Sequence, residues 1–256
     1  MISGYLRRTA AVALPVLAIA TGVVTTTPAQ ATVQLGFLLD SSGSIGSSNW
    51  TTITTGLGNA VDTLIPVDGS YEISVVTFAT TTSTVINHLL INSVAARTAA
   101  VTAIEAAPYI ATNTHMGDAF NALQTAFAAS TASITATYVN LATDGVPNGG
   151  VDTLTARNAI IAAGVDNISV EAIGSGVDAS FLQNSVCYPG PCDTTAPYNF
   201  PTQGFYIAVD SASEYVTAIQ TKIRTVVNAP EPATLALLGF GLSGIGLARL
   251  RRVRSA

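Results

Sequence analysis

The sequence has few positively charged residues, and most of them lie near its two ends. Its 256 residues include 10 Lys and Arg against 15 Asp and Glu. Residues 32–228 keep four cations, Arg97, Arg157, Lys222 and Arg224, against fourteen acids, a net charge of about −10. So few scattered cations cannot neutralise a row of phosphates. We therefore exclude nucleic acid as a partner and expect the acidic body to favour divalent cations.

Cysteine is scarcer still. The two cysteines, Cys187 and Cys192, enclose Tyr-Pro-Gly-Pro in the segment CYPGPC. A zinc site would need two more ligands, and the two histidines, His88 and His115, are far away in the sequence. In an exported chain this spacing favours a disulfide that closes a small loop.

The N-terminal apolar run is too short to favour a membrane anchor. Residues 1–31 begin with a basic region at Arg7 and Arg8, continue through AAVALPVLAIA, and end in Ala29-Gln30-Ala31. A basic region, a short apolar region and a small-x-small site, in this order, are typical of a secretory signal peptide. We expect signal peptidase to cleave after Ala31.

The other end, residues 229–256, has three parts: Pro230-Glu231-Pro232, an apolar segment over 233–248, and a tail with four arginines. An apolar helix of this length spans about 24 Å, short for a bilayer, although flanking arginines can snorkel. A last buried helix would give no reason for the arginines. This end resembles the PEP-CTERM sorting signal of Gram-negative bacteria. The resemblance implies transient anchoring in the inner membrane by a transmembrane helix, cleavage near Pro230-Glu231-Pro232 by an exosortase, and a final place at the cell surface or outside the cell.

Between the two ends, segments with strand patterns alternate with segments of helical periodicity. The expected strands are 33–39, 71–78, 84–89, 136–141, 167–173 and 205–209, and the expected helices are 49–65, 94–106, 117–129, 153–163 and 213–227. Strands that alternate with helices imply parallel pairing, and only 84–89 is expected to pair antiparallel, with 71–78. We predict one three-layer α/β domain over 32–228, a doubly wound, mostly parallel sheet with helices on both faces. The segment 185–203, which carries the cysteines, is expected to be an insertion.

Oxygen-bearing side chains gather where the predicted strands end. FLLDSSGSIG, residues 37–46, brings Asp40, Ser42 and Ser44 together after an apolar strand, and Asp144 follows another. A loop before a helix supplies Thr112. Parallel strands place such turns in one crevice at the carboxyl edge of the sheet. Hydroxyl and carboxylate oxygens suit Mg²⁺, and Mn²⁺ or Ca²⁺ could use the same ligands. The turn at Asp40 could also be a helix cap, with Ser44 or Ser47 as the capping residue.

The pattern Asp40-x-Ser42-x-Ser44, with Thr112 and Asp144-Gly145 in the same chain order, resembles the metal-ion-dependent adhesion site (MIDAS) of von Willebrand factor type A domains. The resemblance covers roughly residues 32–228. It implies that Ser42, Ser44 and Thr112 supply hydroxyl ligands, that Asp40 and Asp144 hold the ion directly or through water, and that an acidic side chain of a protein partner fills the open position. The family often has glycine before its metal-loop threonine, where this chain has Ala111. Thr114 is the alternative ligand if that loop is shifted.

A hydrolase could be assembled from Ser44, His115 and an aspartate. However, the nucleophile elbow Gly-x-Ser-x-Gly is absent around Ser42 and Ser44, and no phosphate-cradling loop is present. We therefore expect a protein without enzymatic activity: an exported, divalent-metal-dependent adhesion or ligand-binding module whose partner is a protein with an acidic side chain or a component of the extracellular matrix. The alternative is a structural matrix protein in which the metal only stabilises the loops.

Overall fold

A computed structural model describes residues 31–228 of the chain. The predicted signal peptide and the predicted sorting signal, with its apolar segment 233–248, lie outside the described residues. Among the residues the structure describes, no helix has the length and apolar character needed to cross a membrane.

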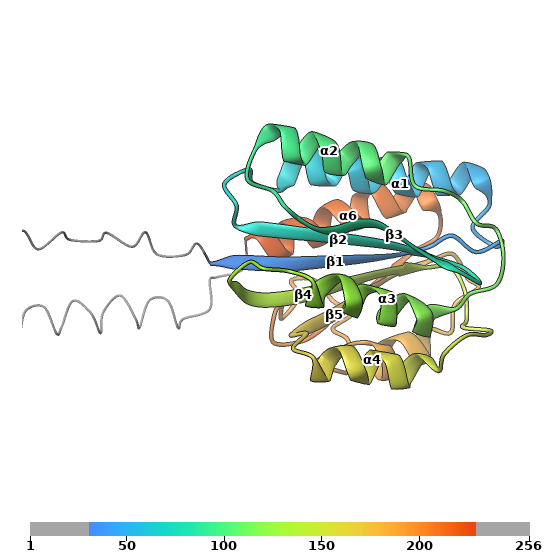
Figure 1. Ribbon diagram of the computed structural model, residues 1–256. Helices are drawn as coiled ribbons and strands as arrows, with labels where there is room; N and C mark the ends of the chain where they lie inside the picture. The colour runs from blue at the N-terminus through green and yellow to red at the C-terminus, as the bar shows by residue number, and fades with distance from the viewer. Residues whose placement is uncertain (1–30, 229–256) are drawn as a thin grey trace, which may run out of the picture.

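A six-stranded sheet in the order β3-β2-β1-β4-β5-β6 forms the centre of the domain (Figure 1). All neighbouring strands are parallel except β2 and β3, which pair antiparallel. The strands are β1 Thr32–Asp40, β2 Tyr71–Phe78, β3 Thr82–Leu90, β4 Ile134–Thr143, β5 Asn167–Ile173 and β6 Tyr206–Val209. The doubly wound α/β class is confirmed, and so is the single antiparallel strand at the edge.

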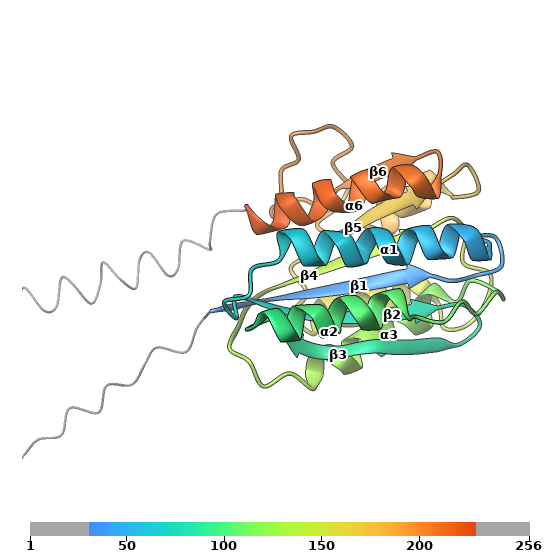
Figure 2. The same ribbon diagram turned by 90° about the horizontal axis from the view of Figure 1, so that it is seen from above.

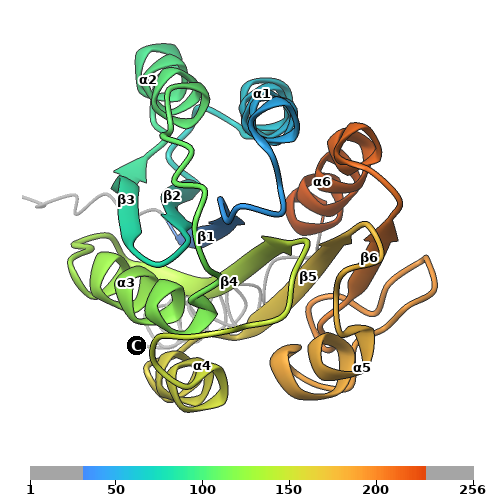
Figure 3. The same ribbon diagram turned by 90° about the vertical axis from the view of Figure 1, so that its right-hand side faces the viewer.

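The helices form a layer on each face of this sheet (Figure 3). One layer holds α1 Ser47–Leu64, α2 Val94–Glu105 and α6 Ala212–Val227, which lie side by side when the molecule is seen from above (Figure 2). The other holds α3 Met116–Ala128, α4 Thr153–Ala162 and the short α5 Ala179–Phe181. Every predicted helix is present, and each of its ends lies within two residues of the prediction.

Alternation along β1 shows how the sheet separates two hydrophobic cores. Leu35, Phe37 and Leu39 belong to the core under α1, α2 and α6, whereas Leu38 points into the core under α3 and α4. A strand covered on both faces needs apolar residues at consecutive positions. This requirement explains the unbroken run FLL immediately before Asp40.

The segment after β5 differs from the prediction. Leu182–Val186 forms a single π-helical turn directly after α5, so the insertion begins later than the expected Ser185. Two consecutive turns of three and five residues are too short to show helical periodicity in a sequence. The disulfide is confirmed: Cys187 and Cys192 are bonded, with their Cα atoms 5.5 Å apart.

Strand order reverses between β1 and β4. The chain passes from β1 to β2 on one side and returns, after β3, to β4 on the other side of β1. The carboxyl ends of these two strands therefore flank the crevice in which open α/β sheets hold ligands. The start of β1 and the end of α6 lie at the opposite edge (Figure 1).

Candidate metal centre

Asp40, the last residue of β1, is held rigidly by its neighbours. Its side chain is 1% exposed. Oδ1 accepts a hydrogen bond from the Ser42 backbone N–H at 2.9 Å, and Oδ2 accepts one from the Thr143 hydroxyl at 2.6 Å. Since Thr143 ends the neighbouring strand β4, two strands and one turn together fix this carboxylate.

The two serines of the turn connect Asp40 to Asp144. Ser42 Oγ lies 3.1 Å from Ser44 Oγ, and Ser44 Oγ donates to Asp144 Oδ1 at 2.8 Å. The structure thus brings four predicted site residues into one contiguous group of oxygen atoms. The capping alternative is wrong, because α1 begins after Gly46 without a side-chain cap and Ser44 is bonded to Asp144 instead.

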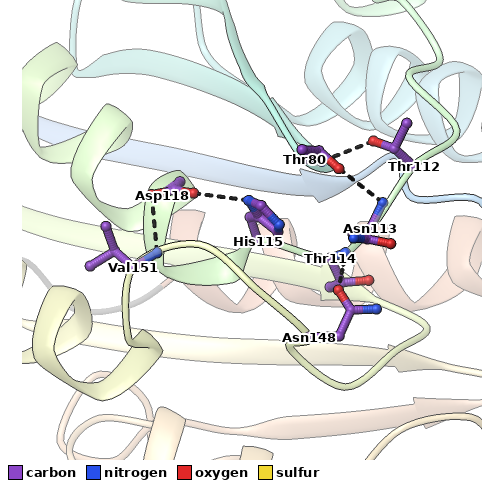
Figure 4. Close-up of polar contacts among 8 residues, drawn as sticks. All are labelled: Thr80, Thr112, Asn113, Thr114, His115, Asp118, Asn148 and Val151. Carbon is purple, nitrogen blue, oxygen red and sulfur yellow. Dashed lines mark hydrogen bonds and ion pairs between the residues drawn. The ribbon is translucent and has the colours of Figure 1, made fainter.

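Thr112 lies beside this group, but its hydroxyl has a different partner. Its carbonyl oxygen accepts from Gly43 N at 2.8 Å, so the two loops are in contact. Its Oγ1 accepts from Thr80 N at 3.0 Å (Figure 4). Thr114, the alternative ligand, is buried, and its Oγ1 is 3.4 Å from the point where a Cβ on Gly145 would be. The assignment of Thr112 as a ligand therefore stays a prediction.

Ala111, directly before Thr112, has a backbone conformation that glycine adopts more easily. Its φ is 61°, in the left-handed region, which costs an L-residue about 1 kcal/mol or more. A hydrogen bond from Ala111 N to Ser41 O, 2.9 Å long, holds the backbone in place. The loop therefore keeps its conformation with alanine at this position, at the cost of a strained backbone at Ala111.

Tyr109 was not predicted from the sequence, yet its hydroxyl bridges the two ends of the turn after Asp40. Its hydroxyl accepts from Gly46 N at 3.0 Å and lies 3.2 Å from both Ser42 O and Gly43 O, to which it can donate. The residue is distant from Asp40 in sequence and belongs to no motif. Nothing in a single sequence pointed to it.

The group carries negative charge that no described cation balances. Burial, the largest effect, raises the pKa of Asp40 from 3.8 to about 6 despite the hydrogen bonds from Thr143 and Ser42. Burial likewise raises the pKa of Asp144. The ion pairs among residues 31–228 join Arg97 to Asp62, His115 to Asp118 and Lys222 to Glu171, and none includes these two acids.

These observations fit a divalent cation held by oxygen atoms. A nearby positive charge would offset the burial of both carboxylates. Within the described range, no three His, Cys, Asp or Glu residues are grouped as a metal site, so the serine hydroxyls would have to complete the ligand set. Two carboxylates with hydroxyls and water form a donor set for a hard cation such as Mg²⁺.

Neither histidine is placed for hydrolysis at Ser44. His115 Nδ1 lies 3.2 Å from Asp118 Oδ2, within the first turn of α3 (Figure 4). His88 sits at φ 42° on the edge strand β3, and its N–H bonds to Ser74 Oγ. Among residues 31–228, no hydrogen bond joins either imidazole to a serine hydroxyl of the turn.

A family model described as the von Willebrand factor type A domain matches residues 34–208, and a model described as the PEP-CTERM protein-sorting motif matches residues 228–252. The second match marks the chain for export through the envelope of a Gram-negative bacterium. No match to a curated protein was found.

Solved structures share the fold at low sequence identity. Proximal thread matrix protein 1 from the mussel byssus matches with a TM-score of 0.62 and 18% identity over 78% of this chain, which spans only 49% of the mussel chain. A further structure of the mussel protein has a zinc-occupied MIDAS motif. The pilus adhesin SpaC from Lactobacillus rhamnosus GG matches at 0.58 and 13%, over 78% of this chain and 31% of its own. Manganese-loaded TRAP protein from Plasmodium vivax matches at 0.53 and 21%, over 76% of this chain and 74% of its own.

Proposed function

Because the chain belongs to the von Willebrand factor type A family, we propose that it is an exported adhesion module that captures a ligand through a divalent cation. The proposal rests most directly on one observation: Asp40 ends β1 and Asp144 directly follows the neighbouring strand β4; the two are linked by hydrogen bonds through Ser42 and Ser44 and have no described cationic partner. In our proposal these four residues hold the cation, and Thr112 is the fifth ligand, with Thr114 as the alternative.

The cation in our proposal is Mg²⁺, with Mn²⁺ or Ca²⁺ as substitutes. Mg²⁺ keeps several waters and binds through one or two carboxylates, which matches two aspartates and small hydroxyls. A bound cation would supply an open coordination position for an external carboxylate. The ligand is accordingly a protein with an acidic side chain, or a matrix component that offers one.

The two ends of the chain complete the proposal. Signal peptidase would cleave after Ala31, the binding domain would comprise residues 32–228, and 229–256 would hold the protein briefly in the inner membrane. An exosortase would then act near Pro230-Glu231-Pro232. Mass spectrometry of the extracellular protein tests this course, since peptides that contain Arg251 or Arg252 in the extracellular material would contradict it.

Members and structural neighbours of the family are mainly adhesion or matrix proteins, which supports a role without catalysis. A structural matrix role is the second candidate, supported by the shared fold of the mussel thread matrix protein. A chelator separates the two roles. Loss of ligand capture from extracellular material supports adhesion, whereas a lower melting temperature with capture unchanged supports the structural role.

Calorimetric titration with Mg²⁺ and Mn²⁺ tests the site itself. We expect Asp40→Ala and Asp144→Ala to abolish metal binding while the domain stays folded. Ser41→Ala is the matched control, because the Ser41 hydroxyl donates to Phe78 O at 3.0 Å and points away from the site. Unchanged metal affinity in Asp40→Ala would show that this turn binds no ion.

A further inference from the structure

A groove of about 380 Å³ lies between the loop after β4 and the start of α5. Its walls include Val146 and Val151, which are 47% and 41% exposed. Of the large hydrophobic side chains among residues 31–228 only three are exposed, and the third is Val94, at the start of α2. Two of these three exposed side chains therefore line the same groove and give it an aliphatic wall.

The loop that carries both valines is fixed against the start of α3. Asn148 Oδ1 accepts from Thr114 N at 2.8 Å, and Asp118 Oδ1 accepts from Val151 N at 3.3 Å (Figure 4). Gly150, with φ at 75°, packs so closely on Asp118 that a side chain would not fit there. A groove that is formed in advance binds with a smaller loss of conformational entropy than a mobile loop.

Both walls of the groove belong to loops that adjoin Asp144. Val146 follows Asp144 by two residues, and the opposite loop packs on the same aspartate, since a Cβ on Gly176 would lie 2.7 Å from Asp144 O. An extended chain advances about 3.3 Å per residue. A segment with a carboxylate at the metal therefore reaches the groove within a few residues.

The charged residues in the groove wall are both acidic. Asp152 and Asp178 line it, and each also caps a helix, through hydrogen bonds from Thr155 N at 2.8 Å and from Phe181 N at 2.9 Å. Neither carboxylate takes part in an ion pair among residues 31–228, and the capping bonds lower the pKa of Asp152, which keeps it ionised. A positively charged side chain beside an aliphatic one would complement this wall.

We propose that the groove selects the ligand: it holds an aliphatic side chain, and a neighbouring Lys or Arg, of the same protein segment whose carboxylate lies at the metal. This inference rests on the proposed function and adds the chemical class of the partner, an extended peptide that combines one acidic, one aliphatic and one basic residue within a few positions.

Selection from a library of random peptides displayed on phage, on the purified protein in Mg²⁺, tests the inference. We expect the enriched peptides to carry Asp or Glu together with an aliphatic and a basic residue at a constant spacing. One enriched peptide is then titrated against Val146→Ser and Val151→Ser, for which we expect about tenfold weaker binding. Val94→Ser is the matched control, because it replaces an exposed valine on α2, away from the groove, and should leave binding unchanged.

The results distinguish a failure of the groove proposal from a failure of the proposed metal-dependent function. Metal-dependent binding that Val146→Ser and Val151→Ser leave unchanged would overturn the groove while the proposed function stands. Binding that survives a chelator but is lost in the valine variants would support the groove and contradict metal-dependent capture. Enriched peptides without an aliphatic and basic bias, or no enrichment at all, would overturn the inference.

Discussion

The Thr143 hydroxyl, on the strand next to β1, donates a 2.6 Å hydrogen bond to the Asp40 carboxylate. Thr143 directly precedes Asp144, so a neighbour of one site aspartate orients the other. The bond is fully buried, and both residues lie at the ends of parallel strands. The end of β4 and the residue after it therefore both serve the proposed metal centre: Thr143 positions the Asp40 carboxylate, and Asp144 supplies the second carboxylate.

Replacing Thr143 with valine should weaken metal binding about tenfold, because the Asp40 carboxylate loses a charge-assisted hydrogen bond of about 1.5–3 kcal/mol. Calorimetric titration with Mg²⁺ measures the effect. Thr77→Val is the control, since Thr77 is equally buried near the end of β2 but its hydroxyl has no hydrogen-bond partner among residues 31–228. Equal metal affinities in the two variants would contradict a positioning role for Thr143.

Tyr109→Phe should also weaken Mg²⁺ binding, by several-fold, with little loss of packing, because only the hydroxyl that bridges Gly46 and the Ser42–Gly43 carbonyls is removed. The comparison is Tyr198→Phe, which removes a hydroxyl in the insertion, away from the site. We expect that variant to bind metal like the wild type. A Tyr109→Phe protein with wild-type affinity would show that the turn keeps its shape without the bridge.

The metal-free protein should lose stability as the pH rises. An unfolded aspartate ionises near its ordinary pKa of 3.8, whereas folded Asp40 ionises at about 6. Between these values the folded state holds a proton that the unfolded state has released. Protonated Asp40 therefore stabilises the folded state relative to the value at neutral pH by about 3 kcal/mol. This contribution is fully present below about pH 4 and is lost as the pH rises through about 6. The pKa of Asp144 is also raised by burial, so its ionisation also lowers the stability of the metal-free protein as the pH rises.

Urea unfolding in EDTA across this pH range measures the loss. Asp40→Asn is the matched variant, because an amide does not titrate, and its stability should fall less steeply than that of the wild type. Adding Mg²⁺ at neutral pH should restore stability to the wild type only. Identical pH profiles for the two proteins would contradict a raised pKa at Asp40.

A fourth prediction concerns the core. Lys222 Nζ lies 3.4 Å from Glu171 Oε1, and both side chains are buried. Lys222→Met would leave the Glu171 carboxylate buried without its positively charged partner, which costs about 3–5 kcal/mol. Arg224→Met, two residues along the same helix but exposed, should cost little. Thermal unfolding of both variants decides whether the pair stabilises the attachment of α6.

The strands and most of the site were predictable because the signals are local. An unbroken apolar run before Asp40 marks a strand covered on both faces, and the polar turn after it marks the crevice edge. The partner of the Thr112 hydroxyl was not predictable, since the contact with Thr80 depends on how two loops meet in space. The bridge through Tyr109 and the groove beside Val146 depend on tertiary packing in the same way.

Among the described residues, β1 starts and α6 ends at the edge of the sheet opposite the proposed metal site, and this placement has a mechanical consequence (Figure 1). A ligand that pulls at the carboxyl end of β1 while the chain is held at the end of α6 would apply tension nearly parallel to the strands (Figure 1). β1 is hydrogen-bonded along its length to β2 on one side and to β4 on the other. Tension in this direction shears both ladders, so many hydrogen bonds resist together instead of opening one at a time. The central strand that carries Asp40 is thus the one best supported against force.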